Sequence, residues 1–206
     1  MSARVTVVDL GLGNLGSVMQ ALVRAGGEPR LSADAVEIGR SARAVLPGVA
    51  AFGLGMDRAQ RLGLRGALER ALQRGAPVLG ICLGMQILFE EGEEDGLRKG
   101  LGFLPGRVTR LPAGVQVPHI GWQRLERTAA SPLLEEGAAP WAYFANSYRC
   151  EAPADVTQAV ADHSGVRIAA VVGRGGVHGV QFHPEKSAGG GEGLLARFLR
   201  LPEASP

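Results

Sequence analysis

The sequence predicts an α/β protein with a doubly wound, flavodoxin-like and mostly parallel sheet, helices on both of its faces, and antiparallel edge strands added in the second half. Two observations carry this prediction. Short β-branched runs alternate with amphipathic helical segments through the first half of the chain. From Gly106 onward the segments become short, β-rich and separated by Gly and Pro. The length of 206 residues suits one domain, residues 1–206, and the hydrophobic content of 46% supplies a sizeable core.

The elements of the first half follow from their patterns. Residues 4–10 form a β-branched apolar run, which is typical of a buried parallel strand. Residues 64–74 place Leu64, Leu68 and Leu72 on one helical face, and Gly75 ends that helix. By the same reasoning, strands are expected at 29–32, 42–46 and 77–82, and helices at 17–24 and 83–90.

The second half begins with an acidic loop at residues 91–96 and continues with short apolar runs. We expect these runs to form hairpins and edge strands of the sheet. Their ranges are 107–111, 115–117, 141–145, 157–161, 166–172 and 177–182. Three consecutive glycines at 189–191 predict a flexible hinge or turn, followed by a terminal helix over 192–199.

Composition argues against several classes of function. The 22 basic and 20 acidic residues nearly balance, so the chain has no basic stripe for a nucleic acid. No apolar run is long enough to span a membrane, and the start does not resemble a signal peptide. Two cysteines do not make a disulfide framework, and no Cys/His pair has zinc-ligand spacing. We therefore expect a cytoplasmic protein with no metal and no cofactor.

The segment Gly80-Ile81-Cys82-Leu83-Gly84 joins a predicted strand to a predicted helix. A reactive side chain between glycines on such a sharp turn is typical of a nucleophile elbow, here with cysteine instead of serine. The amino end of the following helix favours the thiolate form of a cysteine, which is the nucleophilic form. The alternative is that Cys82 is only a small buried side chain, as free cysteines often are.

A second motif, His183-Pro184-Glu185, makes catalysis the better interpretation. The two charged side chains are two positions apart, so in an extended backbone they project to one side. His183 would act as base toward Cys82, and Glu185 would orient the imidazole, which is the logic of a catalytic triad. The alternative for a single histidine is a hydrogen-bonded core residue.

Two glycine-rich turns have less specific patterns. Residues 11–16 match G-x-G-x-x-G between a strand and a helix, the context of dinucleotide binding, but no clear acidic residue ends the second strand. We favour a tight turn with Asn14 near the helix start; a non-enzymatic nucleotide-binding or regulatory module remains the alternative.

The loop at 47–53 should face Cys82, because strand carboxyl ends line the crevice of such sheets. Backbone N–H groups of Gly48, Val49 and Ala50, with that of Leu83, would then bind an oxyanion, although an ordinary Pro-Gly turn is also compatible.

Taken together, the chain resembles the class I, triad-type glutamine amidotransferases. Within that family it is most similar to the glutaminase subunits of imidazole glycerol phosphate synthase, of histidine biosynthesis. The resemblance runs over nearly the whole chain, through VDLGLGNLGSV, LPGVAAFG, GICLGMQILFEEGEE, VPHIGWQ, YFANSY and GVQFHPEKS. The elbow and FHPE are shared by the whole superfamily, whereas VPHIGWQ and YFANSY indicate this member.

The resemblance implies a chemistry and a set of substrate contacts. Cys82 would attack the side-chain amide of glutamine and form a γ-glutamyl thioester, while His183, held by Glu185, would deliver a proton to the leaving ammonia. Ala50 stands where the family usually has Gly. Such an alanine would cost about 1 kcal/mol if its φ were positive. The residues implied in holding glutamine are Gln86, Glu94, Ser147 and Tyr148.

The resemblance also implies a partner. Ammonia would pass to a cyclase subunit with a (β/α)8-barrel fold, in a heterodimer that makes imidazole glycerol phosphate and aminoimidazole carboxamide ribotide. The residues implied in contacting that subunit are His119, Gly121, Trp122 and Gln123. A glutaminase subunit of another synthase and a free γ-glutamyl hydrolase remain alternatives.

Overall fold

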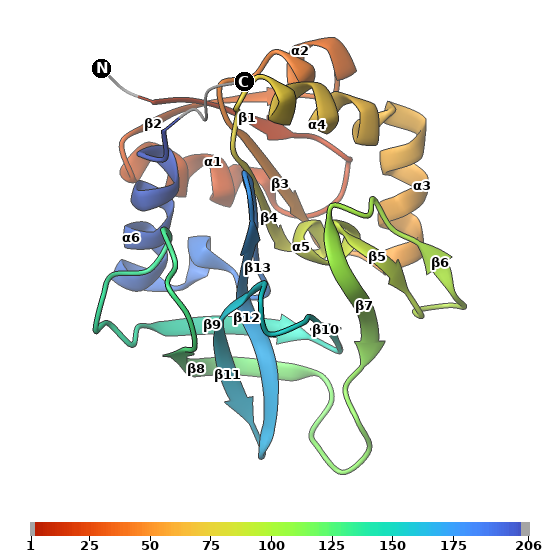
Figure 1. The fold of residues 1–206 in the computed structure, drawn as a ribbon, viewed down its shortest axis with the longest axis vertical. Helices are drawn as coiled ribbons and strands as arrows, with labels where there is room; N and C mark the ends of the chain where they lie inside the picture. Colours follow the sequence, from red (N-terminus) through yellow and green to blue (C-terminus); the bar gives the residue numbers. More distant parts are fainter. Residues whose placement is uncertain (1–2, 203–206) are drawn as a thin grey trace.

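The computed structural model describes residues 3–202, and its centre is a nine-stranded sheet in the order β2-β1-β3-β4-β13-β12-β11-β8-β9 (Figure 1). The first five strands in this order are parallel and have the flavodoxin-like arrangement. The other four are antiparallel, and the predicted fold class is confirmed. The strands are β1 (Ala3–Val8), β2 (Gly27–Ser32), β3 (Ala44–Gly48), β4 (Val78–Cys82), β8 (His119–Arg127), β9 (Trp141–Asn146), β11 (Thr157–His163), β12 (Val166–Arg174) and β13 (Val177–Val180).

Helices cover both faces of this sheet, because alternate strand residues point to opposite sides. Val5 and Val7 pack on one side with α1 (Leu15–Arg24) and α6 (Ala188–Leu199). Val8 packs on the other side. That side is covered by α2 (Ala35–Gly39), α3 (Phe52–Leu62), α4 (Leu64–Gln73) and α5 (Leu83–Ile87).

Part of the second half forms a separate sheet in the order β10-β7-β5-β6. It stands beside α3 and α5 (Figure 1). The expectation that the late runs join the main sheet is therefore correct for β9, β11, β12 and β13, whereas the run expected at 107–111 lies in the second sheet. The main sheet also contains β8, which was not predicted. The strands of the second sheet are β5 (Phe89–Gly92), β6 (Arg98–Lys99), β7 (Leu104–Arg110) and β10 (Tyr148–Glu151).

The helix expected over 83–90 ends early, at Ile87, and β5 begins at Phe89. The carbonyls that would continue the helix accept hydrogen bonds from a later segment instead. Leu101 donates its N–H to Ile87, and Leu104 donates to Leu88. Pairing with residues far along the chain thus overrides local helical periodicity.

Two other expectations were wrong. Residues 115–117 lie in bends and irregular backbone before β8 and form no strand. The glycines at 189–191 are not a hinge but belong to α6. A Cβ on Gly191 would collide with the carbonyl oxygen of Pro184, so this glycine lets α6 pack closely against the 3₁₀ turn Pro184–Lys186.

Helix α3 was not predicted, because glycines interrupt its pattern. The structure explains one of them by a close approach. A Cβ on Gly55 would lie 3.1 Å from the Leu83 side chain and 3.3 Å from that of Ile87. Gly55, which makes this segment look unlike a helix in the sequence, is therefore the residue that allows α3 to pack closely against α5.

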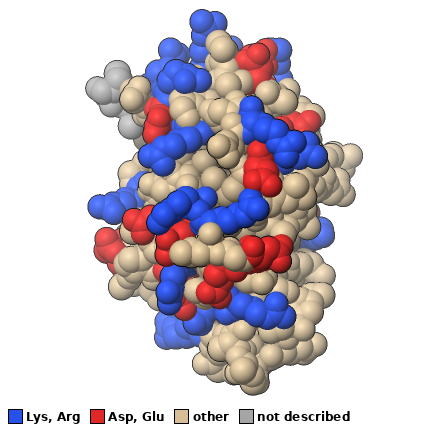
Figure 2. Space-filling model, turned by 90° about the vertical axis from the view of Figure 1, so that its right-hand side faces the viewer, with Lys and Arg blue, Asp and Glu red and all other residues tan. Residues whose placement is uncertain are grey.

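Charged side chains of both signs are interspersed over the face that carries α3 and β6 (Figure 2). Within residues 3–202, none of the helices has the length and apolar character needed to cross a bilayer.

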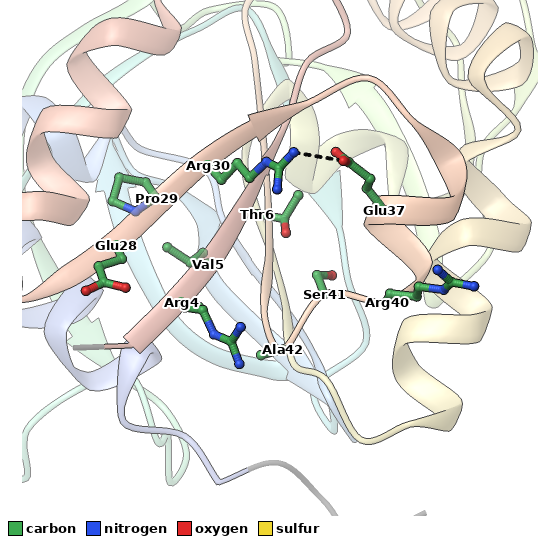
Figure 3. A pocket seen from close by; sticks show the side chains of 10 residues that line it. All are labelled: Arg4, Val5, Thr6, Glu28, Pro29, Arg30, Glu37, Arg40, Ser41 and Ala42. Carbon is green, nitrogen blue, oxygen red and sulfur yellow. Dashed lines mark hydrogen bonds and ion pairs between the residues drawn. The ribbon is translucent and has the colours of Figure 1, made fainter. Parts of the chain in front are cut away.

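A hollow of about 520 Å³ lies near the amino ends of β1 and β2 (Figure 3). Its lining includes Arg30 and Glu37, which form an ion pair of 2.9 Å, but no cysteine or histidine, so it is not the candidate site.

Candidate active site

Cys82 is the last residue of β4 and precedes the first turn of α5, as predicted for an elbow. Its φ of 54° and ψ of −111° are uncommon for a residue with a side chain. Close packing accounts for the glycines on either side. A Cβ on Gly80 would lie 2.6 Å from backbone atoms of Gly84 and Met85, and one on Gly84 would overlap the carbonyl oxygen of Leu46.

The parallel pairing of β13 with β4 brings the His-Pro-Glu motif to this elbow. Val180 pairs with Ile81, so the residues after Val180 continue beside Cys82 at the carboxyl end of the sheet. His183 and Glu185 have side chains only 4% and 5% exposed, and His183 Nδ1 lies 2.8 Å from Glu185 Oε1. The structure thus gathers the three residues predicted as a triad.

The surroundings of His183 raise its pKa to about 9. Burial by itself lowers this pKa, but hydrogen bonds with the Cys82 side chain and with Glu185 raise it by more. The imidazole is therefore protonated at neutral pH. It holds a proton beside the cysteine sulfur, ready for transfer to a leaving group.

The backbone around His183 is anchored to β9. Its N–H donates to the carbonyl of Tyr143 over 2.9 Å. The buried hydroxyl of Ser187 donates to the His183 carbonyl over 2.6 Å and accepts from the Tyr143 N–H over 2.9 Å. Sequence reasoning did not identify Ser187, because nothing in its local pattern separates it from an ordinary turn serine.

A cavity of about 210 Å³ opens at Cys82. All four residues expected to hold glutamine line it, together with three of the four expected at the oxyanion position. Asn146 was not predicted; its Nδ2 donates to the Tyr148 carbonyl, and its buried Oδ1 has no hydrogen-bond partner among the described residues. The lining residues are Val49, Ala50, Cys82, Leu83, Gln86, Glu94, Ala145, Asn146, Ser147 and Tyr148.

Glu94 connects the cavity to α3. Its Oε2 accepts a hydrogen bond of 2.7 Å from the N–H of Phe52, the first residue of that helix. The helix has no side-chain cap from its own N-cap residue, Ala51. Glu94 therefore supplies the missing cap from 42 positions away and fixes the start of α3 directly after the expected oxyanion segment.

That expected oxyanion segment lies next to the elbow. Gly48 pairs with Cys82 in the sheet, and a Cβ on Gly48 would lie 3.2 Å from the Leu83 side chain. Val49 is 55% exposed. Ala50 does not have a positive φ, so its side chain causes no backbone strain in this conformation.

The G-x-G-x-x-G turn is packed against the same segment. Gly11 and Gly13 have φ values of 67° and 95°, and a Cβ on Gly13 would lie 3.1 Å from the backbone nitrogen of Val49. Asn14 is the N-cap of α1 and accepts from the N–H of Ser17 over 3.3 Å. Gly11 and Gly13 thus allow a tight turn, and Gly13 also allows the close contact with Val49, which agrees with the interpretation of this motif as a turn.

The four residues expected at a partner surface divide between two sides of β8, a strand that was not predicted. His119 is 1% exposed and stacks between the rings of Phe144 and His163, so the expectation that it contributes to this surface is wrong. Gly121 and Gln123, two and four positions further on, are half-buried, whereas Trp122 is exposed. Strand alternation is the physical reason, and it adds Ile120, which is 62% exposed, to the outer side.

The chain belongs to the class I glutamine amidotransferase family, whose sequence model, described as "Glutamine amidotransferase class-I", matches residues 7–200. Among curated relatives, it is 47% identical to the imidazole glycerol phosphate synthase subunit HisH of Symbiobacterium thermophilum, over 97% of this chain and 94% of that one. It is 42% identical to the subunit of the same name from Salinibacter ruber, over 96% and 94%. A solved structure of PurLQS from Thermotoga maritima superposes with a TM-score of 0.74 at 25% identity, over 95% and 96%.

Proposed function

We propose that this chain is the glutaminase subunit of an imidazole glycerol phosphate synthase. It would act in the cytoplasm, hydrolyse glutamine to glutamate and pass the ammonia to a cyclase subunit with a (β/α)8-barrel fold. Relatives named as HisH subunits of that synthase, at 47% and 42% identity, support the assignment. The observation that carries it is the elbow cysteine lying beside His183, whose Nδ1 is held by Glu185.

The first step is attack on the substrate amide. The Cys82 sulfur, as thiolate, adds to the side-chain carbonyl carbon of glutamine while His183 keeps its proton. The carbonyl oxygen becomes an oxyanion, which the N–H groups of the 48–50 segment and of Leu83 receive.

The second step expels ammonia. The tetrahedral intermediate collapses, the carbon–nitrogen bond breaks, and His183 gives its proton to the leaving nitrogen, which leaves a γ-glutamyl thioester on Cys82. Neutral His183 then takes a proton from a water molecule that attacks the thioester, and glutamate is released. Glu185 stays ionised and stabilises the imidazolium whenever it forms.

Glutamine itself would lie in the 210 Å³ cavity with its amide toward Cys82. Gln86, Glu94 and the backbone near Ser147 and Tyr148 would together bind the amino and carboxylate groups of glutamine. Glu94 has one carboxylate oxygen bound to the start of α3, so its position in the cavity is already fixed before substrate arrives.

The partner would dock on the outer side of β8 and β9. Ile120, Trp122 and Trp141 are 62%, 46% and 56% exposed, and Trp122 packs edge-on against Tyr143 at 5.9 Å. Exposed aromatic clusters of this kind are typical of protein interfaces. The same strand β9 leads into Ala145 and Asn146 of the cavity, so a subunit bound here would be near the point where ammonia forms.

The deciding experiment measures glutamine hydrolysis by the wild type and by Cys82→Ala, each with and without the cyclase subunit. We expect Cys82→Ala to lose at least ~1,000-fold in kcat, because the covalent route is removed. Cys150→Ala is the matched control, since Cys150 is buried but does not line the cavity. Undiminished hydrolysis by Cys82→Ala would refute the mechanism.

The partner is tested in the same assay. If ammonia production is coupled to synthesis, the wild-type rate rises when the cyclase and its substrate are added, because docking shifts the 48–50 segment toward a conformation that donates to the oxyanion. Equal rates with and without them, and no co-purification with a barrel subunit, would favour a free γ-glutamyl hydrolase.

A further inference from the structure

Gln181 is a buried amide that the triad chemistry does not use. It follows Val180 of β13 and lies beside Cys82, because Val180 pairs with Ile81 in the parallel part of the sheet. Its side chain has no exposure to solvent. An amide has two donor hydrogens and an acceptor oxygen, and burying them without hydrogen-bond partners destabilises the folded protein. The contacts that Gln181 makes are therefore informative about its role.

Those contacts join two parts of the candidate site. The Oε1 atom of Gln181 accepts a hydrogen bond of 3.1 Å from Gln86 Nε2. Its Nε2 atom donates toward the Cys82 sulfur over 3.9 Å. Gln86 Nε2 also donates to the Tyr148 carbonyl over 3.2 Å. A continuous chain of hydrogen bonds thus runs from the wall of the cavity, through two amides, to the nucleophile.

This series of hydrogen bonds sets the orientation of the side-chain amides of Gln86 and Gln181. Gln86 has its donor group engaged on Tyr148 and Gln181, which leaves its Oε1 as an acceptor for the ammonium group of an amino-acid substrate. A flipped Gln181 would turn its oxygen toward the sulfur and its NH₂ group toward that of Gln86, and both contacts would be repulsive. Only one arrangement satisfies all members, so the orientation of each amide depends on the other.

We propose that Gln181 is a positioning residue that presents an N–H group to the sulfur of Cys82 and at the same time holds Gln86 in the orientation that receives the substrate ammonium. The proposal rests on the proposed glutaminase function and extends it to a residue outside the triad. The side chain of Gln181 contacts both Cys82 and Gln86, so the position of the nucleophile and the orientation of the substrate-binding amide depend on each other.

Two substitutions separate the two contacts. Gln181→Glu keeps an acceptor for Gln86 but replaces the N–H near the sulfur by a carboxylate oxygen. We expect kcat for glutamine hydrolysis to fall at least ~10-fold with KM within about twofold of wild type, since the loss falls on the reacting sulfur. Alkylation of Cys82 by iodoacetamide at pH 7, followed by peptide mass spectrometry, should slow at least ~10-fold, because only the thiolate reacts.

Gln181→Met removes both contacts at similar volume. We expect kcat to fall and KM to rise as well, each about 5–10-fold, because Gln86 loses the partner that orients it. Gln158→Glu on β11 is the matched control: Gln158 Oε1 accepts from the Ser131 hydroxyl over 2.7 Å, and the residue does not line the cavity. This control should leave kcat, KM and the alkylation rate unchanged.

A merely structural role would lower the melting temperature of both Gln181 variants and reduce kcat in both without any difference in KM between them. That pattern, or wild-type alkylation of Cys82 in Gln181→Glu, would overturn the proposal. Failure of the proposed function would appear elsewhere, as absence of glutamine hydrolysis in the wild type, while the alkylation measurement still reports whether Gln181 acts on Cys82.

Discussion

His183 is held from two sides, by the Cys82 side chain and by Glu185, and this environment determines its charge. Both hydrogen bonds favour the protonated imidazole strongly enough to outweigh burial. Because the folded pKa is raised above the ordinary value of 6.5, this group contributes stability that is fully present below pH 6.5 and is lost as pH rises through about 9.

Glu185→Gln should lower the pKa of His183, since it removes a carboxylate that stabilises the imidazolium. We expect the high-pH limb of the kcat/KM profile for glutamine to move down by about one pH unit, with kcat reduced at least ~10-fold. A pH-rate profile of both proteins measures this. An unchanged limb would mean that Glu185 does not control the charge of His183.

At His119 and His178 burial is not outweighed by hydrogen bonds, so the pKa of each is lowered and not raised. Burial lowers the pKa of each to about 4, and for His119 the charge of His163 adds to this. Both side chains are therefore neutral when folded, and stability is lost as pH falls from 6.5 toward 4. We expect each to cost roughly 1–2 kcal/mol in free energy of unfolding at pH 5 relative to pH 7.

Denaturant unfolding of the wild type and of His119→Phe at the two pH values tests this. The phenylalanine keeps a ring next to Phe144 but cannot gain a proton, so the variant should lose less stability between pH 7 and pH 5. An equal loss in both proteins would show that His119 does not contribute to acid sensitivity.

Among the elements, α6 positions the segment that carries His183 through a close backbone contact. Gly191→Ala would drive a Cβ into the Pro184 carbonyl, next to His183. We expect a large loss of kcat, ~10-fold or more, from displacement of the imidazole. Gly193→Ala in the same helix meets no atom within 4 Å and should stabilise the protein by about 0.5–1 kcal/mol without changing kcat. Activity and melting curves of the two variants separate the outcomes, and equal activities would contradict this role of α6.

For the whole molecule, the proposed docking surface for the cyclase subunit is the exposed face of β8 and β9. Trp122→Ala should weaken binding of the cyclase subunit about 10–100-fold by calorimetry, because aromatic anchors dominate such interfaces, while hydrolysis without the partner stays unchanged. Leu97→Ala is the control, since Leu97 is 70% exposed but lies between β5 and β6. Equal weakening by both substitutions would argue against docking on β8 and β9.

Local patterns were sufficient where the physical requirement is itself local. Gly80 is needed by the turn that carries Cys82, and the apolar spacing of α4 is a property of one helix. The spacing of two positions from His183 to Glu185 likewise predicts a contact within one short segment, and the structure has it at 2.8 Å.

Residues whose role depends on distant partners could not be predicted in this way. Gly55 looks like a helix breaker until Leu83 and Ile87 are seen against it, and Glu94 caps a helix that begins 42 positions earlier. His119 was expected at a partner surface from the resemblance to a family, and no local pattern showed that the alternation of β8 turns its side chain into the core.

By itself, the sequence determined the order of the main elements of the parallel half, the elbow and the His-Pro-Glu segment, because hydrogen bonding and side-chain direction within a helix, strand or turn depend on neighbours a few positions away. Only the tertiary structure decided that β13 lies between β4 and β12, and hence that Gln181 and His183 meet Cys82. Strand order depends on which buried faces fit together across long separations, and no local periodicity encodes that choice.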